Sequence, residues 1–510
     1  MRRQMYIRKI IYWPVDMKNK HLKLVLIVVD ILFLLQLAGC TSSEQFYDDA
    51  TLSRDAAYRQ WKNQKKVQEQ SQTRIKGQLS LQDCLKLTLI NNKVLQRVIQ
   101  EKEIARGNKL ASYSAILPSV NLTGDYTRLD EVSSVAGFTI GDVDNYSADL
   151  VVTQPIFAGG SIIAKINAGK LFSLITNQTV RATTQDVIYD AECSYYDVLL
   201  NQHLYQISAD AVRSAQAHLD DVKLKRSSGV ASNFDVLRAE VELSNFQAEL
   251  IQNKNTINVS KIQLLKVMGI SQDSDFVPSD ELSYAPLKMT MEKAVETAYR
   301  NRPDLYERQF DIKYQKELLN IARSQYWPTI SGFYDNKWAK PDPHNSLLID
   351  WGHAWQAGIT ATLPVFDGFA REGEIIQQKA RFKQSQIDLI DAEETTLFEL
   401  TKALLTIEDA EEFVQSQRLN LTRAEEGSRL AQVGYREGIN TQVEVIDAES
   451  ALTKAKSLYY QAVYSHIIAK LYLQKAMGTI ATFDAALSEN QVRPTEILSK
   501  ETPTNLKDKN

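Results

Sequence analysis

One short stretch separates two kinds of pattern in the chain, and it reads Gln154-Pro155-Ile156-Phe157-Ala158-Gly159-Gly160. Before it, residues 146–153 alternate between apolar and polar side chains, which predicts a β-strand with one apolar face. We expect Pro155 to end this strand, because proline cannot donate a hydrogen bond to a β-ladder. We expect Gly159 and Gly160 to let the backbone turn into the next element.

After this stretch, the pattern predicts one very long helix. Residues 161–226 contain no proline and only one glycine. Apolar side chains recur there every seven residues, at Ala191, Val198, Tyr205, Val212 and Leu219. At ~1.5 Å per residue this helix spans on the order of 100 Å, whereas an ordinary globular helix has only about 11–12 residues.

The motif occurs a second time, as Leu363-Pro364-Val365-Phe366-Asp367-Gly368, again between an alternating segment and a long proline-free run. Other landmarks return with the same spacing of 209–210 residues, such as Gly229 with Gly438 and Met268-Gly269 with Met477-Gly478. The chain is therefore predicted to be a tandem repeat, with the first repeat at 79–269, a linker at 270–290 and the second repeat at 291–478.

Each repeat is expected to hold one β-hairpin between helices. The strands are predicted at about 119–129 and 146–154 in the first repeat, and at about 329–338 and 351–363 in the second. Residues 130–145, rich in Asp, Ser and Gly, are expected to form the first hairpin's turn.

Helices are predicted on both sides of these strands. Helical spacing over 79–114 predicts one helix before the first hairpin. After a break at 226–232, residues 234–268 are predicted to return antiparallel to the long helix, because the connection is short. The predicted fold class is mainly α with membrane β-strands, a tandem repeat of long antiparallel coiled-coil helices plus two β-hairpins.

The N-terminus has the features of an export signal. Basic residues precede the apolar run Leu24–Leu37, whose length of about 14 residues suits a signal peptide, since a membrane span needs about 20. Residues 1–39 are predicted to be this peptide, with Met17 as the expected initiator. Leu37-Ala38-Gly39-Cys40 resembles a bacterial lipobox, so Cys40 is expected to be acylated. Residues 40–78 are predicted to form a strap on the body, and 479–510 a polar tail.

Composition excludes several classes of function. The net charge of −4 and the scattered basic residues give no footprint for nucleic acid. Cys40, Cys84 and Cys193 have no metal-binding or disulfide spacing. No Asp or Glu pairs with a His or Cys at a spacing usable for catalysis, so neither an enzyme nor a cofactor is expected.

The predicted strands suit a membrane. Strands of roughly ten residues with alternating character, and with Trp338, Trp351 and Trp355 near one end, are typical of a bilayer-spanning barrel with an interfacial aromatic band. Four strands cannot close, and an open sheet leaves unpaired edges in lipid. Other copies of the chain must therefore complete the barrel, and a strand-rich rim on a long helical tube is a duct.

This doubled pattern resembles the TolC family of outer-membrane efflux proteins over nearly all of the mature chain. The helical turns at 229–237 and 434–448 also resemble the family's turns, and the lipobox is similar to the lipidated, drug-efflux branch. The resemblance implies a homotrimer with a twelve-stranded barrel in the outer membrane and a helical tunnel in the periplasm. It also implies docking to a periplasmic adaptor protein and an inner-membrane transporter, for which the chain is a passive exit duct.

The resemblance further implies roles for particular residues. Glu444 and Asp447 would line the narrow periplasmic entrance, where a trimer gathers their carboxylates into two rings. Asp235 and Tyr435 would keep the entrance shut through a phenol–carboxylate hydrogen bond. A family member has Arg at the position of Asn440, so one latch is absent unless Arg436 replaces it. The tip residues implied to contact the adaptor are Gly229, Val230, Ala231, Gly438, Ile439 and Asn440.

Three other functions share parts of this pattern. An exit duct for type I protein secretion uses the same architecture, and the sequence does not distinguish the cargo. A periplasmic adaptor lipoprotein also has helical hairpins, but its strands build soluble domains. A lipid-anchored coiled-coil scaffold has no use for amphipathic strand hairpins.

Overall fold

The computed structural model describes residues 43–67, 75–135, 138–345 and 349–480, in two units divided at residue 73. The predicted signal peptide, Cys40 and most of the predicted tail lie outside these residues. In the first unit the structure forms helix α2 (Ser43–Val67). Much of the stretch predicted as a strap is therefore helical. The 25 residues of α2 include neither proline nor glycine, the two residues that disfavour a helix most. All further description concerns the second unit.

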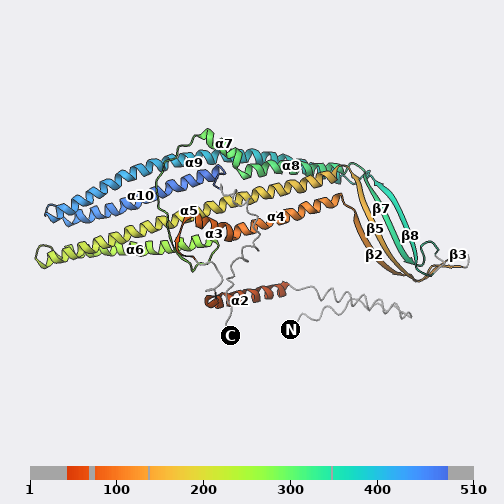
Figure 1. The fold of residues 1–510 in the computed structure, drawn as a ribbon, viewed down its shortest axis with the longest axis horizontal. Helices are drawn as coiled ribbons and strands as arrows, with labels where there is room; N and C mark the ends of the chain where they lie inside the picture. The colour runs from red at the N-terminus through yellow and green to blue at the C-terminus, as the bar shows by residue number, and fades with distance from the viewer. Residues whose placement is uncertain (1–42, 68–74, 136–137, 346–348, 481–510) are drawn as a thin grey trace, which may run out of the picture. The chain divides into compact units, whose positions relative to one another are not determined.

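The long helices are the main feature of this unit (Figure 1). Helices α5 (Ser161–Ser227) and α9 (Ala370–Arg436) each contain 67 residues. The shorter helices α6 (Asn233–Met268) and α10 (Gln442–Ala476) return along them, which confirms the predicted helical hairpins. Gly159 has φ +60°, and a Cβ there would lie 2.5 Å from the Ser324 carbonyl oxygen, so this turn requires glycine.

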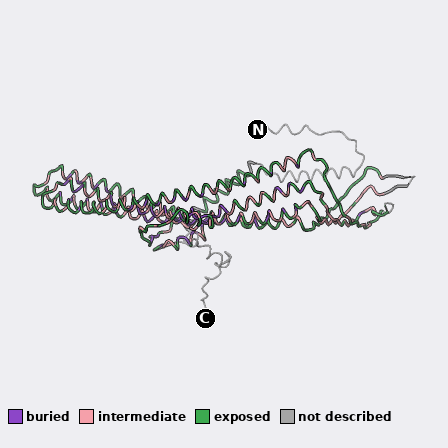
Figure 2. Tube along the Cα trace, turned by 90° about the horizontal axis from the view of Figure 1, so that it is seen from above, coloured by how far each residue is buried: buried purple, intermediate pink, exposed green. Residues whose placement is uncertain are grey.

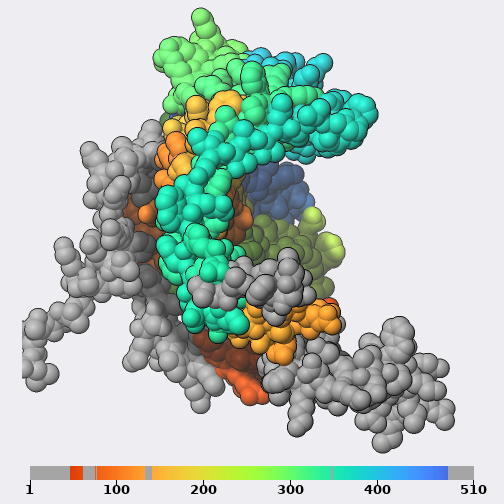
Figure 3. Space-filling model, turned by 90° about the vertical axis from the view of Figure 1, so that its right-hand side faces the viewer, coloured from red at the N-terminus to blue at the C-terminus, as the bar shows by residue number. Residues whose placement is uncertain are grey.

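Four strands form one antiparallel sheet beside one end of these helices (Figure 1), and Figure 3 views the molecule from that side. They are β2 (Ser119–Arg128), β5 (Asp144–Ala158), β7 (Thr329–Lys340) and β8 (Gly352–Thr362), in the order β2-β5-β7-β8. The β5–β7 pair joins the two repeats. Among strands of the described residues, none pairs with the outer edge of β2 or of β8.

The register gives this sheet two different faces. On one face Val120 is opposite Val152 and Leu122 is opposite Leu150, and Trp355 continues this row across β7. On the other face Asp149 is opposite Lys337, and their side chains form an ion pair at 3.4 Å. The predicted alternation of apolar and polar residues is thus confirmed.

Pro155 does not end the strand, which continues to Ala158. Pairing with β2 stops at Thr153. Beyond it, Gln154, Pro155, Phe157 and Ala158 pair only with β7, and the ladder is irregular between Pro155 and Phe157. Proline has no backbone N–H to donate, and it is tolerated here because the strand has a partner on one side only and the ladder is already irregular. The predicted turn at 130–145 also contains two short strands, β3 (Ser133–Val135) and β4 (Phe138–Ile140).

The single helix predicted over 79–114 is wrong, because the structure divides it. Strand β1 (Lys76–Leu79) comes first, and helices α3 (Leu81–Asn91) and α4 (Lys93–Ser112) follow, with the 3-10 turn η1 (Tyr113–Ala115). Asn92 interrupts the helix because its side chain accepts from Leu95 N at 3.0 Å and donates to the Val267 carbonyl at 2.7 Å. In the second repeat, α7 (Met291–Asn301) and α8 (Pro303–Ser324) divide at Arg302.

The predicted linker at 270–290 is partly a strand. Strand β6 (Asp275–Pro278) pairs in parallel with β1, and Phe276 lies buried against Leu79, Tyr195 and Leu264. Elsewhere the buried residues follow the lines along which the helices meet (Figure 2). Among the described residues, no helix is both long and apolar enough to cross a membrane.

Candidate functional site at the helix tips

Both helical hairpins turn in the same way. Gly229 (φ +76°) and Gly438 (φ +73°) adopt the left-handed conformation that ends α5 and α9. Ser232 and Asp235 then form a capping box at α6, in which Ser232 N donates to the Asp235 carboxylate at 2.8 Å. Thr441 N donates to Glu444 at 2.7 Å in the equivalent box of α10. The backbone N–H and hydroxyl of Ser232 lower the pKa of Asp235.

A cleft lies between the two turns, and we call it the tip cleft. It is lined by Lys225, Val230, Ala231, Asp235, Tyr435, Arg436, Gly438, Asn440, Thr441 and Gln442. The structure therefore brings together both predicted latch residues and four of the predicted tip residues. Glu444 and Asp447 are exposed on α10 outside its wall. Gly229 and Ile439 are also outside the wall, and Ile439 is 80% exposed.

Within the described residues of this chain, Asp235 and Tyr435 have other partners than each other, and their expected hydrogen bond stays a prediction. The Asp235 carboxylate accepts from the main chain and hydroxyl of Ser232, both at 2.8 Å. Lys225 instead places its ammonium group 3.7 Å from the centre of the Tyr435 ring. The physical reason is that the capping box offers Asp235 two donors only three residues away, at no cost in long-range ordering.

Lys225 lies in the last turn of α5 and forms an ion pair within this helix. Its ammonium group forms an ion pair with Asp221 at 3.0 Å. Burial lowers the pKa of Lys225, but its hydrogen bonds to Asp221 and Tyr435 outweigh burial and leave the pKa above its usual value. Sequence reasoning missed Lys225, because a lysine near a helix C-terminus is normally a solvated charge.

Gln442 ties the two hairpins together at the cleft. Its side chain is buried, and Nε2 donates to the main-chain carbonyl of Asp235 at 2.9 Å. Asp235 thus contributes to the contact between hairpins through its backbone rather than its carboxylate. Sequence reasoning missed Gln442, because its partner, the Asp235 carbonyl, lies 207 residues away in the chain.

In the described part of the chain, no group of three His, Cys, Asp or Glu side chains is arranged to hold a metal ion. The tip cleft is lined by hydrogen-bonding and charged groups of both hairpins, and Gln442 donates from one hairpin to the other.

Comparison with known proteins places this geometry among outer-membrane proteins. The family model described as "Outer membrane efflux protein" matches residues 84–270 and 294–479. The toluene efflux pump outer membrane protein TtgC of Pseudomonas putida is 22% identical over 404 residues, covering 78% of this chain and 83% of the relative. The proteases secretion protein PrtF of Dickeya chrysanthemi is 21% identical over 418 residues, covering 79% and 88%.

A solved structure supports the fold. The CmeC outer membrane channel of Campylobacter jejuni aligns with a TM-score of 0.69 and 16% identity, covering 80% of this chain and 88% of that chain. This likeness confirms the predicted fold class of long paired helices with two β-hairpins.

Proposed function

Because the chain belongs to the outer membrane efflux protein family, we propose that it is the outer-membrane exit duct of a tripartite efflux system. It is a channel protein of the outer membrane and not an enzyme. The duct passively conducts substrates that a periplasmic adaptor protein and an inner-membrane transporter deliver. The resemblance to the TolC family predicted from the sequence is thus confirmed at the level of the family.

The observation that carries this proposal is the sheet. Its strands have one apolar and one polar face, as a wall between lipid and an aqueous lumen requires. Rings cluster near one end of it, where Tyr146 contacts Tyr126 at 5.0 Å and Trp351 at 6.2 Å between centroids. The open edges of β2 and β8 support completion by two further copies, which gives a homotrimer with a twelve-stranded barrel.

We infer a second attachment to the membrane at Cys40. The lipobox preceding it supports acylation after removal of residues 1–39. Cys40→Ser would then abolish lipid labelling while the barrel keeps the protein in the outer membrane. Release of this variant into the soluble fraction would contradict the barrel.

The entrance of the duct is proposed at the tips. Glu444 and Asp447 lie three residues apart on α10, so a trimer would gather six carboxylates around one axis. The tip cleft, with Asp235 and Tyr435 in its wall, is proposed to set how firmly this entrance is closed. The apex residues Gly229, Val230, Ala231, Gly438, Ile439 and Asn440 are proposed to contact the adaptor, and the exposure of Val230 (78%) and Ile439 (80%) supports this.

Two measurements test the proposal. Native mass spectrometry in detergent should give a trimer, and a monodisperse monomer would contradict both barrel and duct.

In planar bilayers, Glu444→Ala with Asp447→Ala should weaken cation selectivity and block by divalent cations. The control removes the exposed acids Glu408 and Asp409 of α9 and should change neither. Unchanged selectivity in the first variant would show that its carboxylates do not line the entrance.

A second candidate is the exit duct of a type I protein secretion system. It is favoured by the similarity to PrtF, whose name is that of a protease secretion protein. Secretion of a protein substrate that depends on this chain, without any change in drug susceptibility on its deletion, would decide for this alternative.

A further inference from the structure

The interface between α5 and α10, which we call the inter-repeat seam, is held by polar and aromatic contacts. Lys475 of α10 pairs with Asp186 of α5 at 2.7 Å. Nearer the tips, Tyr464 donates to Asp197, and Tyr460 stacks on His203 at 4.2 Å between centroids. Toward the tips, the residue numbers of these partners rise along α5 and fall along α10, as expected for antiparallel helices. Polar and aromatic contacts are therefore spaced along the seam as far as the tip cleft.

Glu449 is the last charged residue of this series before the tips. One of its carboxylate oxygens accepts from Ser214 Oγ of α5 at 2.5 Å. The other accepts from Gln432 Nε2 of α9, also at 2.5 Å. An ionised carboxylate only accepts hydrogen bonds, and bonds to it are shorter and stronger than bonds between neutral groups. Glu449 thus joins three helices from both hairpins.

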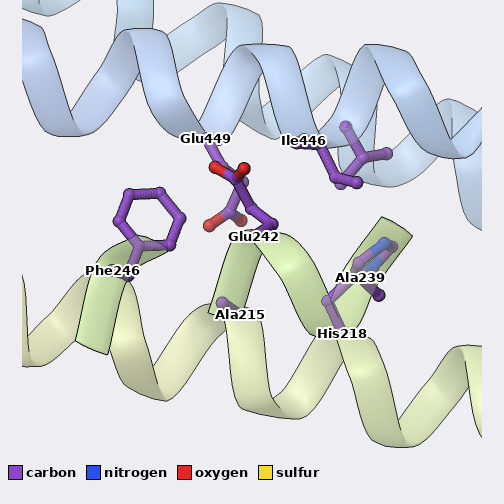
Figure 4. A pocket seen from close by; sticks show the side chains of 8 residues that line it. Ala215, His218, Ala239, Glu242, Phe246, Ile446 and Glu449 are labelled. Atoms are coloured by element: carbon purple, nitrogen blue, oxygen red, sulfur yellow. The ribbon is translucent and has the colours of Figure 1, made fainter. Parts of the chain in front are cut away.

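A small cavity beside this contact offers a matched comparison (Figure 4). Its walls come from α5, α6 and α10, and Glu449 and Glu242 both project into it between apolar side chains such as Phe246 and Ile446. Glu242 is bound much less closely, because its carboxylate accepts from Ser450 at 3.4 Å. Two acids therefore share one environment, and only Glu449 has two short hydrogen bonds.

We propose that Glu449 is the positioning residue that holds hairpin α9–α10 against hairpin α5–α6 through Ser214, while Gln432 orients its carboxylate, and that this arrangement is the closed one. This inference rests on the proposed duct function. Glu449 lies on the second turn of α10 after the capping box, at about 12 Å along the helix from Thr441. Closer to the tips, the contact of Gln442 with the Asp235 carbonyl is a neutral hydrogen bond between the two hairpins. Releasing Glu449 therefore frees the part of α10 that carries Glu444 and Asp447.

The test measures single-channel conductance of the full-length protein in planar bilayers. Glu449→Ala should raise the open-to-closed ratio by about tenfold or more, because the hydrogen bond from Ser214 to the carboxylate, which joins the two hairpins, is lost. Ser214→Ala should raise it less, and adding Ser214→Ala to Glu449→Ala should produce no further increase. Glu242→Ala removes the same charge from the same cavity and should leave the ratio near that of the wild type.

Several outcomes would overturn the inference. Equal effects of Glu449→Ala and Glu242→Ala would show that cavity charge acts, rather than the hydrogen bonds of Glu449. Additive effects of Ser214→Ala and Glu449→Ala would show that the two side chains act independently. If Glu449→Ala does not assemble, Glu449→Gln keeps the side-chain volume and should give an intermediate increase, and no increase would refute the inference. A wild-type protein that forms no channel would instead refute the proposed function.

Discussion

The interface within a hairpin and the interface between the repeats are built from different chemistry. The hairpin seam, between α5 and α6, is filled by Ala211, Ala215, Leu219, Val222, Val236, Ala239, Leu243 and Phe246, all buried. It also has an ion pair, Lys223–Glu240, and a hydrogen bond, from Asn253 to Ser208. The inter-repeat seam between α5 and α10 instead depends on an ion pair, hydrogen bonds and stacked rings. Opening the hairpin seam exposes apolar surface to water, which costs about 25 cal/mol of free energy per Å². Opening the inter-repeat seam costs less, because its polar groups form hydrogen bonds with water instead. Each hairpin is therefore expected to move as a unit, and the hairpins to separate from each other.

The largest effect is expected in the hairpin seam. Leu219 is 3% exposed, and Leu219→Ala should lower the free energy of unfolding by about 2–5 kcal/mol, because a methyl-lined cavity remains. Chemical or thermal unfolding in detergent measures this loss. Leu224→Ala, on the same helix at 68% exposure, is the matched control and should stay within about 0.5 kcal/mol of the wild type.

A small loss in Leu219→Ala would mean that the two helices separate without exposing this residue. The hairpin would then not be a rigid unit, and the contrast between the two seams would disappear.

A smaller effect is expected in the inter-repeat seam. Tyr464→Phe removes the hydroxyl that donates to Asp197 and leaves this half-buried carboxylate without that donor. The expected loss is about 1–3 kcal/mol, as for a hydrogen bond to a charged group. Hydrogen exchange should locate the increased opening along α10 rather than along α6. Faster exchange in both α6 and α10 would show that the two seams open together.

The sequence predicted part of the hairpin seam. Of the seven-residue pattern, Leu219 is buried in this seam and the partly buried Val212 packs against it, whereas Ala191 and Val198 are buried in other clusters and Tyr205 is only partly buried. The tandem repeat also predicted the equivalent turns, because glycine at the C-terminus of a helix and Ser or Thr before the next are local signals. Local chemistry of this kind can be recognised without knowledge of the partner helix.

The inter-repeat seam could not be predicted in the same way. Glu449 and Ser214 are 235 residues apart, and a glutamate on a long helix is most often a solvated side chain. Asn92 and Arg302 were missed for a related reason. They occupy equivalent positions in the two repeats, and each donates to a carbonyl at the end of the returning helix, Val267 for Asn92 and Ala476 for Arg302. Because one position holds Asn and the other Arg, a comparison of the two repeat sequences does not reveal that both side chains bind the end of the returning helix.

The smallest expected effect is a pH dependence at His218, where the two seams meet. His218 of α5 lies 5.5 Å from the Tyr435 ring of α9 and lines the cavity that also holds Glu242 of α6 and Glu449 of α10. Its Nε2 is buried without a hydrogen-bond partner. Burial lowers the pKa of His218, Asp221 and Glu449 raise it, and Lys225 lowers it, with a net result below the usual value. The effect is small because the acids partly offset burial.

The sign follows from linkage. The packed state holds His218 with a pKa below that of the unfolded chain, so protons bind the unfolded state more readily. The stability contributed by the neutral ring is complete above the unfolded pKa of about 6.5 and is lost as the pH falls below it. Tm should therefore fall more in the wild type than in His218→Gln between about pH 8 and pH 5.5. Equal losses of Tm in both proteins would mean that protonated His218 is paired with Glu449 and Asp221 as favourably as it is solvated, and the inter-repeat seam would then be indifferent to protons at this point.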